Sequence, residues 1–315
     1  MPRPYSLLSR MKTLIYYLLY GLLAAGLLLG LAGVPALAFG RIVTDQLGRQ
    51  LVVPEDPQRL VTLAASLTEI VFALGQGNRL VGVEQFSDYP PAARELPTVG
   101  SYINPDVERI VALRPDLCLA IKDGNPYHRV ARLEGLGIPV YAVDPRNLAG
   151  VIRTVEEIGG LLNAAIQAAA LREDLSRRYQ RLRSLVERLD RRPRVFFQIG
   201  TSPIVSAGSH TFLDELITTA GGLNLAAGKV PYPRFSQEQV LALQPEIIVI
   251  TSMTRGEVFE RVKADWGRWA GLPAAREGKI FLVDSDIVDR PAPRIFDGLE
   301  LLFRLFHPHL AGELP

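Results

Sequence analysis

The sequence is poor in the side chains that most often form disulfides or bind metals, with one cysteine and four histidines among 315 residues. A single cysteine excludes a disulfide bond within the chain. Cys118 lies in an apolar run, where we expect a small buried side chain. The spacing of the histidines matches no common zinc or iron site. We therefore expect no resident metal centre, including at His307 and His309 near the C-terminus.

Catalytic motifs are also missing. The chain contains no Gly-x-Ser-x-Gly, no phosphate-binding loop and no Gly-x-Gly-x-x-Gly that opens a helix. The formal net charge is +2, and no basic patch is interleaved with aromatic residues, as nucleic-acid binding would require. We expect neither catalysis nor nucleic-acid binding. The alternative is an enzyme with a two-lobed α/β fold, and such an enzyme would need a metal or cluster in the purified protein.

The first 38 residues are predicted to be a signal peptide. Three cations precede an apolar run over residues 14–34, and small residues follow from Pro35 to Ala38, after which cleavage is expected. No cysteine lies just after the run, so a lipid anchor has no acceptor and we expect a free periplasmic protein. Because the run is almost long enough to span a bilayer, the alternative is an uncleaved anchor, which would make the chain a membrane-anchored ligand sensor.

One segment of the chain occurs twice. Residues 107–120 read VERIVALRPDLCLA and residues 237–250 read QEQVLALQPEIIVI, so that Glu108 falls on Glu238. Each copy is predicted to be a short amphipathic helix that ends before a proline and continues into an apolar strand. The two copies predict two similar lobes, each with an acidic residue at the equivalent place.

The repeat extends to other elements. Strands are predicted at residues 60–64 and 194–198, each followed by a polar loop and a helix, and at residues 137–144 and 278–286. Strands that alternate with helices predict α/β units around mainly parallel sheets. We therefore expect an α/β fold of two similar lobes with mainly parallel sheets, joined by a long backbone helix and separated by a ligand cleft.

The connection between the lobes is predicted to be helical. Residues 148–161 form one expected helix and residues 163–190 a second, with Asn163 as its N-cap. The second helix would span about 40 Å at about 1.5 Å per residue, so it can reach from one lobe to the other, and we expect only small lobe movements. The predicted division is a signal peptide 1–38, an N-terminal lobe 39–147, a helical linker 148–192, a C-terminal lobe 193–306 and a tail 307–315.

Aromatic and polar residues gather on loops that follow predicted strands in both halves of the chain. Ligands of open α/β sheets bind beyond the carboxyl ends of the strands. Rings on both sides of a cleft suit a broad, amphipathic ligand, and polar groups beside them fix its orientation. The candidate ligand-binding residues are Phe86, Tyr102, Tyr127, Tyr232, Asp286, Arg290 and Arg294.

The chain resembles a known family over nearly all of its length beyond the signal peptide. The stretches SLTEIVFALG, NPDVERIVALRPDL and VPYPRFSQEQVLALQPEIIVIT and the closing APRI are similar to periplasmic substrate-binding proteins of the helical-backbone class. That class serves ABC importers of cobalamin, haem and iron siderophores. FSDYPP, the VPYP loop and the spacing of Asp286 and Arg290 are similar to the pattern of its cobalamin-binding members.

The resemblance implies a role for each candidate residue. Phe86, Tyr102 and Tyr232 would stack on the corrin ring and nucleotide loop of cobalamin, and Asp286 and Arg290 would hydrogen-bond its amide side chains. The ligand would then be cobalamin or another corrinoid, with haem or a ferric siderophore as the alternative.

The resemblance also implies a partner. Glu108 and Glu238 would contact arginines on the two subunits of an ABC permease that works with a cytoplasmic ATPase, and the binding protein itself is expected to be a monomer. The chain departs from the cobalamin binders by having Tyr102, Ile121 and Tyr232 where they have tryptophans. The smaller aromatic area leaves room for cobinamide, haem or an iron chelate.

Overall fold

The structure, a computed structural model, describes residues 40–251 and 257–314. The predicted signal peptide, its cleavage site and the alternative anchor lie outside the described residues. Within those two ranges, no helix is both long and apolar enough to cross a lipid bilayer. The described chain begins with β1 (Gly40–Thr44) and β2 (Gln50–Pro54), which pair in a two-stranded sheet.

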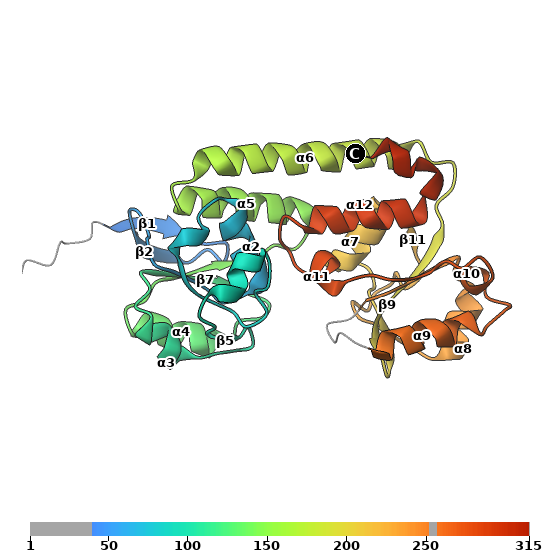
Figure 1. Ribbon diagram of the computed structural model, residues 1–315, viewed down its shortest axis with the longest axis horizontal. Helices are drawn as coiled ribbons and strands as arrows, with labels where there is room; N and C mark the ends of the chain where they lie inside the picture. The colour runs from blue at the N-terminus through green and yellow to red at the C-terminus, as the bar shows by residue number, and fades with distance from the viewer. Residues whose placement is uncertain (1–39, 252–256, 315) are drawn as a thin grey trace, which may run out of the picture. The chain divides into compact units, whose positions relative to one another are not determined.

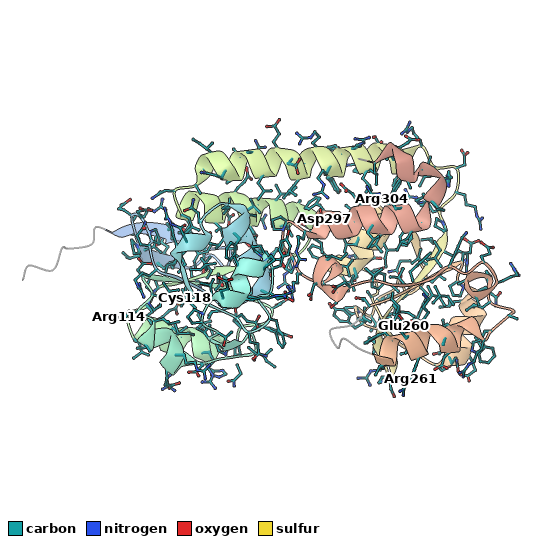
Figure 2. All side chains as sticks on the ribbon, viewed as in Figure 1. Arg114, Cys118, Glu260, Arg261, Asp297 and Arg304 are labelled. Atoms are coloured by element: carbon teal, nitrogen blue, oxygen red, sulfur yellow. The ribbon has the colours of Figure 1, made fainter. Side chains whose placement is uncertain are left out.

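The first lobe is built on a four-stranded parallel sheet with the order β4-β3-β7-β8 (Figure 1). In β7, Leu117 and Leu119 belong to one buried cluster, whereas Cys118 and Ala120 belong to another. This alternation places apolar residues on both faces, as expected for a parallel sheet covered on each side. Figure 2 shows Cys118 inside this lobe. The lobe comprises β3 (Leu60–Thr62), α2 (Ala65–Ala73), η1 (Gly77–Arg79), β4 (Leu80–Val83), η2 (Pro91–Glu95), β5 (Gly100–Ser101), β6 (Asn104–Pro105), α3 (Val107–Ala112), β7 (Leu117–Ile121), α4 (Tyr127–Gly135) and β8 (Val140–Val143).

The second lobe has a six-stranded mixed sheet. Strands β9, β13 and β14 are parallel, which confirms the prediction, but β10 and β12 form an antiparallel arm beside β9 that the sequence did not predict. The lobe comprises β9 (Arg194–Thr201), β10 (Ile204–Ser206), α7 (Phe212–Thr219), β11 (Leu223–Asn224), β12 (Arg234–Phe235), α8 (Gln237–Leu243), β13 (Ile247–Ile250), α9 (Glu257–Gly267), α10 (Pro273–Arg276), β14 (Ile280–Leu282), α11 (Ser285–Val288) and α12 (Ile295–Phe306).

The duplicated segment folds in the same way in both lobes. It forms α3 and β7 in the first lobe and α8 and β13 in the second. The carboxylate of Asp116 accepts a hydrogen bond from the backbone N–H of Arg59 (3.0 Å), and that of Glu246 accepts one from the N–H of Arg194 (3.0 Å). Each arginine also donates to a carbonyl at the end of the helix that precedes the acid: Arg59 to Leu113 (2.6 Å) and Arg194 to Leu243 (2.7 Å). We call these two arrangements, Arg59 with Asp116 and Arg194 with Glu246, the lobe staples.

The helical linker consists of α5 (Leu148–Leu161) and α6 (Ala165–Glu187), which lie side by side (Figure 1). The prediction of Asn163 as N-cap is wrong. Asn163 has a φ of 56° and donates its side-chain amide to the carbonyl of Glu55 (2.9 Å), so it forms the turn between the helices instead. The turn brings Gly159 close to Ala168, whose methyl group leaves no room for a Cβ at residue 159.

The predicted tail packs against the second lobe. His307 is buried, residues Pro308–Glu313 form a short 3-10 helix (η3), and Leu314 belongs to the core of that lobe. Arg188, which follows α6 directly, forms an ion pair with Glu313 (3.0 Å), and Arg181 of α6 donates to the Glu313 carbonyl. The end of the described chain is therefore tied to both α6 and the core.

Candidate ligand site

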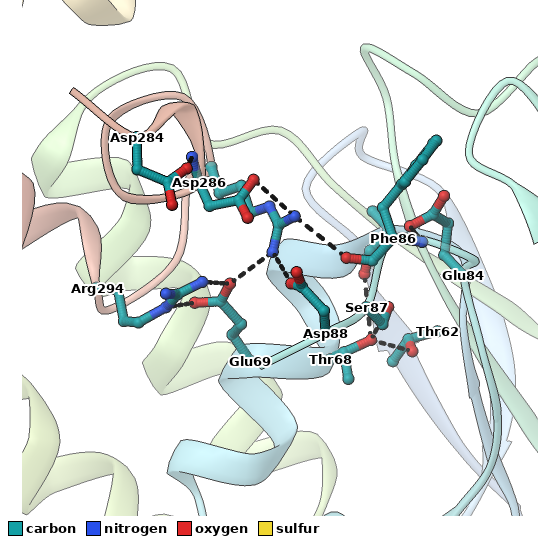
Figure 3. Close-up of polar contacts among 12 residues, drawn as sticks. Thr62, Thr68, Glu69, Glu84, Phe86, Ser87, Asp88, Asp284, Asp286 and Arg294 are labelled. Carbon is teal, nitrogen blue, oxygen red and sulfur yellow. Dashed lines mark hydrogen bonds and ion pairs between the residues drawn. The ribbon is translucent and has the colours of Figure 1, made fainter. Parts of the chain in front are cut away.

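Arg290 links the two lobes. Its Nη1 donates to Asp88 (2.9 Å) and to Glu69 (3.3 Å), and its Nη2 donates to the carbonyl of Phe86 (3.1 Å), all in the first lobe. Within the second lobe it pairs with Asp286 (2.8 Å). Figure 3 shows these groups converging from α2, the loop after β4 and the segment around α11. Asp286 and Arg290, two of the predicted ligand-binding residues, thus bond to each other, and the guanidinium already has four acceptors.

Arg294 forms both of its side-chain hydrogen bonds with Glu69. Its Nε and Nη2 donate to the two carboxylate oxygens of Glu69 (2.8 and 2.6 Å), and its guanidinium lies over the ring of Tyr89 (3.8 Å to the centroid). Glu69 has a side-chain exposure of only 2%. Burial alone would lower the pKa of Arg294, but the hydrogen bonds and the charge of Glu69 raise it above its ordinary value, so the group stays charged. We call Glu69, Asp88, Arg290 and Arg294 the interlobe latch.

A chain of buried hydroxyl groups holds the first-lobe side of the latch. Thr68 lies one residue before Glu69 on α2, and its hydroxyl contacts those of Thr62 (2.7 Å) and Ser87 (2.8 Å) (Figure 3). Ser87 is therefore fixed to the helix, and its neighbours Phe86 and Asp88 are presented from a defined backbone. Hydrogen-bonded hydroxyls of this kind can be buried at little net cost.

The predicted aromatic residues differ in how the structure supports them. Phe86 is 51% exposed beside the latch. Tyr102 is half-buried, and its ring lies against Gly124, where a Cβ would come within 2.9 Å of it. Tyr127 and Tyr232 are 78% and 59% exposed. Within the described part of the chain, no hydrogen bond, ion pair or ring contact joins either of these two tyrosines to the latch.

Glu84 lies buried beneath the loops that carry Phe86 and Tyr102. Its side chain follows β4 directly, the residue is 1% exposed, and its Oε2 accepts a hydrogen bond from the backbone N–H of Phe86 (2.8 Å). Its Oε1 is buried without a hydrogen-bond partner among the residues the structure describes. Burial raises the pKa of Glu84 to about 7, against the effect of the N–H groups of Phe86 and Tyr102 and the charge of Arg290, which lower it.

Glu69, Glu84 and Asp88 were not among the ligand-binding residues predicted from the sequence. Glu69 carried a signal, because it is an acid inside the otherwise apolar helical run SLTEIVFALG, and a buried carboxylate needs a cationic or hydrogen-bonding partner. Glu84 and Asp88 had no such signal, since they stand in a polar loop where exposed acids are ordinary.

The two predicted docking glutamates occupy equivalent positions. Glu108 and Glu238 are both exposed and are both the second residue of a short helix, α3 or α8. Their surroundings differ: Glu108 pairs with Arg132 (3.0 Å), whereas hydrogen bonds from Ser236 and from its own backbone lower the pKa of Glu238. In residues 40–251 and 257–314, no group of three histidine, cysteine or acidic side chains could hold a metal ion.

Comparison with known families matches residues 60–287 to the periplasmic binding protein family. The chain belongs to this family. Its α/β fold of two lobes around parallel strands, with a helical connection, is the fold of the solved relatives. Members of the family that resemble this chain are binding proteins rather than enzymes.

The relatives that resemble this chain include vitamin B12-binding and heme-binding proteins. A vitamin B12-binding protein of Yersinia pestis (strain Pestoides F) is 34% identical over 239 residues, which cover 76% of this chain and 82% of that protein. The solved periplasmic vitamin B12 binding protein BtuF of Vibrio cholerae has a TM-score of 0.70 and 30% identity, covering 82% of this chain and 98% of its own. The periplasmic heme-binding protein RhuT from Roseiflexus sp. RS-1, solved in its apo form, has a TM-score of 0.71 and 27% identity, covering 80% and 98%.

Proposed function

We propose that this protein captures a corrinoid, with cobalamin as the first candidate, in the periplasm and delivers it to an ABC importer. The observation that carries the ligand assignment is the hydrogen bond from Arg290 of the Asp286–Arg290 pair to the carbonyl of the half-exposed Phe86, which puts an aromatic residue of one lobe next to polar groups of the other. A corrinoid offers a large apolar ring edged by amides, so it needs both kinds of contact. The names of the vitamin B12-binding relatives support the same ligand.

Each pocket residue has a proposed task. Phe86, Tyr102 and Tyr232 stack on the ligand, and Tyr127 covers its edge from the start of α4. Asp286 accepts hydrogen bonds from ligand amides and also orients Arg290 (2.8 Å). Because the carboxylate and carbonyl acceptors around Arg290 use its Nη groups, we assign it a ligand contact through donors that remain free or that exchange on binding. The doubly bonded Arg294 supports this site by holding Glu69.

The docking role is proposed for Glu108 and Glu238. The two carboxylates stand at the same position of the same repeated segment, and both are exposed. A pair of equivalent charges suits a partner with two equivalent subunits. We therefore propose that each glutamate meets a cationic side chain on one subunit of the permease.

The ligand proposal is tested by isothermal titration of the protein spanning residues 39–315 with cyanocobalamin, haemin and a ferric siderophore. We expect one-to-one cobalamin binding with submicromolar affinity. Phe86→Ala should weaken it at least about ten-fold, because a buried aromatic contributes about 1.5–3 kcal/mol. Trp269→Ala, which removes an exposed ring after α9, is the control and should leave the affinity unchanged.

The rival ligand is haem, which the similarity to a solved heme-binding protein favours. Three tyrosines on the cleft loops, Tyr102, Tyr127 and Tyr232, could supply an axial ligand. Tight haemin binding without cobalamin binding would keep the transport role and change the ligand. An absence of binding to all three titrants would refute the proposed ligand class.

A further inference from the structure

The floor of the proposed ligand site brings carboxylates and arginines together. Arg290 and Arg294 face the carboxylates of Glu69, Asp88 and Asp286. All three carboxylates are bonded to the arginines, so an incoming anion has to compete with them for the same N–H donors. Charges in such a poorly exposed place are weakly screened by salt. A ligand that brings its own carboxylates therefore places them close to acids that already occupy the guanidinium groups.

Glu84 adds a further acid whose charge can change. It is buried under the Phe86 and Tyr102 loops, and the charged groups that act on it are Asp88 on its own loop and Arg290 from the other lobe. The Phe86 backbone connects these groups directly, because its N–H is bonded to Glu84 (2.8 Å) and its carbonyl to Arg290 (3.1 Å). Among the residues that the structure describes, its second oxygen has no hydrogen-bond partner, so the carboxyl is held through one oxygen only.

We infer that Glu84 is a specificity-determining residue that makes the site prefer amide-bearing corrinoids over tetrapyrroles that carry carboxylates. This inference rests on the proposed function and deepens it. In the ionised form, Glu84 repels a ligand carboxylate placed against Phe86 and Tyr102. An amide has no net charge and can present N–H donors, so the ionised form does not oppose it.

The same geometry predicts how the preference depends on pH. Burial places the pKa of Glu84 at about 7 in the free protein, so the group is partly ionised near neutrality. A bound carboxylate raises this pKa, because like charges disfavour the ionised form. Binding of an acidic ligand must then take up a proton and must weaken as pH rises. A rise of one pKa unit corresponds to about a five-fold loss of affinity between about pH 6 and about pH 8.

The test uses two ligands that share a corrin ring but differ in its edge. Dicyanocobinamide carries amides, and dicyanocobyrinic acid carries carboxylates in their place. Isothermal titrations of the whole protein at about pH 6 and about pH 8 should show the acid binding about five-fold more weakly at the higher pH, with cobinamide unchanged within about two-fold. In Glu84→Gln, which keeps the shape and an acceptor for the Phe86 N–H, the pH dependence of the acid should disappear.

A second measurement needs no substitution. Titrations at about pH 7 in two buffers with different ionisation heats report the protons that are taken up on binding. The wild-type protein should take up about 0.4 proton with cobyrinic acid and close to none with cobinamide. Binding of both corrinoids with equal proton uptake, or the same pH profile in the wild type and Glu84→Gln, would overturn the inference alone. Failure of both corrinoids to bind would instead refute the proposed function on which it rests.

Discussion

The two lobes are alike where they share the repeated segment and unlike where their sheets end. Both have a lobe staple and a short helix with an exposed glutamate at its second position. At the ligand end they divide the charges. The first lobe supplies the carboxylates of Glu69, Glu84 and Asp88, and the second supplies both arginines, Arg290 and Arg294, together with Asp286.

This difference agrees with the roles proposed for the two faces. A partner with two equivalent subunits favours two equivalent surfaces, whereas one asymmetric ligand does not require the two walls of its site to match. The antiparallel strands β10 and β12 extend the main sheet of the second lobe, whereas the antiparallel pair β5 and β6 of the first lobe forms a separate two-stranded sheet, so this region belongs to the divergent part. Two groups of residues can therefore be distinguished. The lobe staples and the exposed glutamates occur in both lobes, whereas the residues of the interlobe latch act only through contacts between the lobes.

Among the features that the two lobes share, the largest effect is expected from charge reversal at both proposed docking positions. We expect Glu108→Arg combined with Glu238→Arg to abolish cobalamin uptake in vesicles that contain the permease, because each proposed salt bridge would become a repulsion. Ligand affinity should stay within about two-fold of the wild type. Reversal of Glu173 and Glu187, two exposed acids of α6, is the matched control. A parallel fall in ligand affinity would move the glutamates from the docking surface to the ligand site.

The next largest effect should come from a substitution in the interlobe latch. Glu69→Gln removes the charge of an almost fully buried carboxylate that is the counterion of two arginines. The free energy of unfolding should therefore fall by about 2–3 kcal/mol. Urea denaturation measures this. Glu187→Gln, which breaks an exposed pair with Arg183, should cost less than about 1 kcal/mol. Equal losses for the two variants would show that the latch does not hold the structure.

The lobe staples give a smaller effect and test the equivalence directly. Asp116→Ala leaves the N–H groups of Gln58 and Arg59 without their acceptor and should cost about 1–2 kcal/mol. Glu246→Ala leaves the N–H of Arg194 and should cost about 1 kcal/mol. Both losses are read from urea midpoints at constant slope. A staple that could be removed from one lobe at no cost would contradict the structural equivalence.

The smallest expected effect concerns Glu84 and pH. Its pKa is raised from an ordinary value of 4.5 to about 7, so the folded protein holds a proton that the unfolded chain has lost. This stabilisation is complete below the unfolded pKa and is lost as pH rises through the folded pKa. Between about pH 6 and about pH 8 the wild type should lose about 1 kcal/mol relative to Glu84→Gln. Chemical denaturation at both pH values checks this, and parallel curves would contradict the raised pKa.

The sequence predicted the parts of the fold that depend on local pattern. The bounds of α5 agree with the predicted helix, and both copies of the repeat form a helix followed by a strand, because apolar spacing and proline act within a few residues. The Asn163 prediction failed because the tight approach of α5 and α6 at Gly159 and Ala168 fixes the turn, and that contact is tertiary.

The candidate site was only partly visible in the sequence. Asp286 and Arg290 are four residues apart and their pairing follows from a helical turn. Their partners on the first lobe, Glu69 and Asp88, are about two hundred residues away in the chain, and no local pattern connects them. The burial of Glu84 likewise depends on loops that come together only when the sheet has formed.

One side chain of α6 has a consequence for how the protein unfolds. Leu171 packs against the main hydrophobic core of each lobe, between Ala168 in the first core and Leu175 in the second. Melting of either core would therefore remove support from the same helix and weaken the other. The two lobes, although built as repeats, should behave as one cooperative unit that shows a single calorimetric transition rather than two.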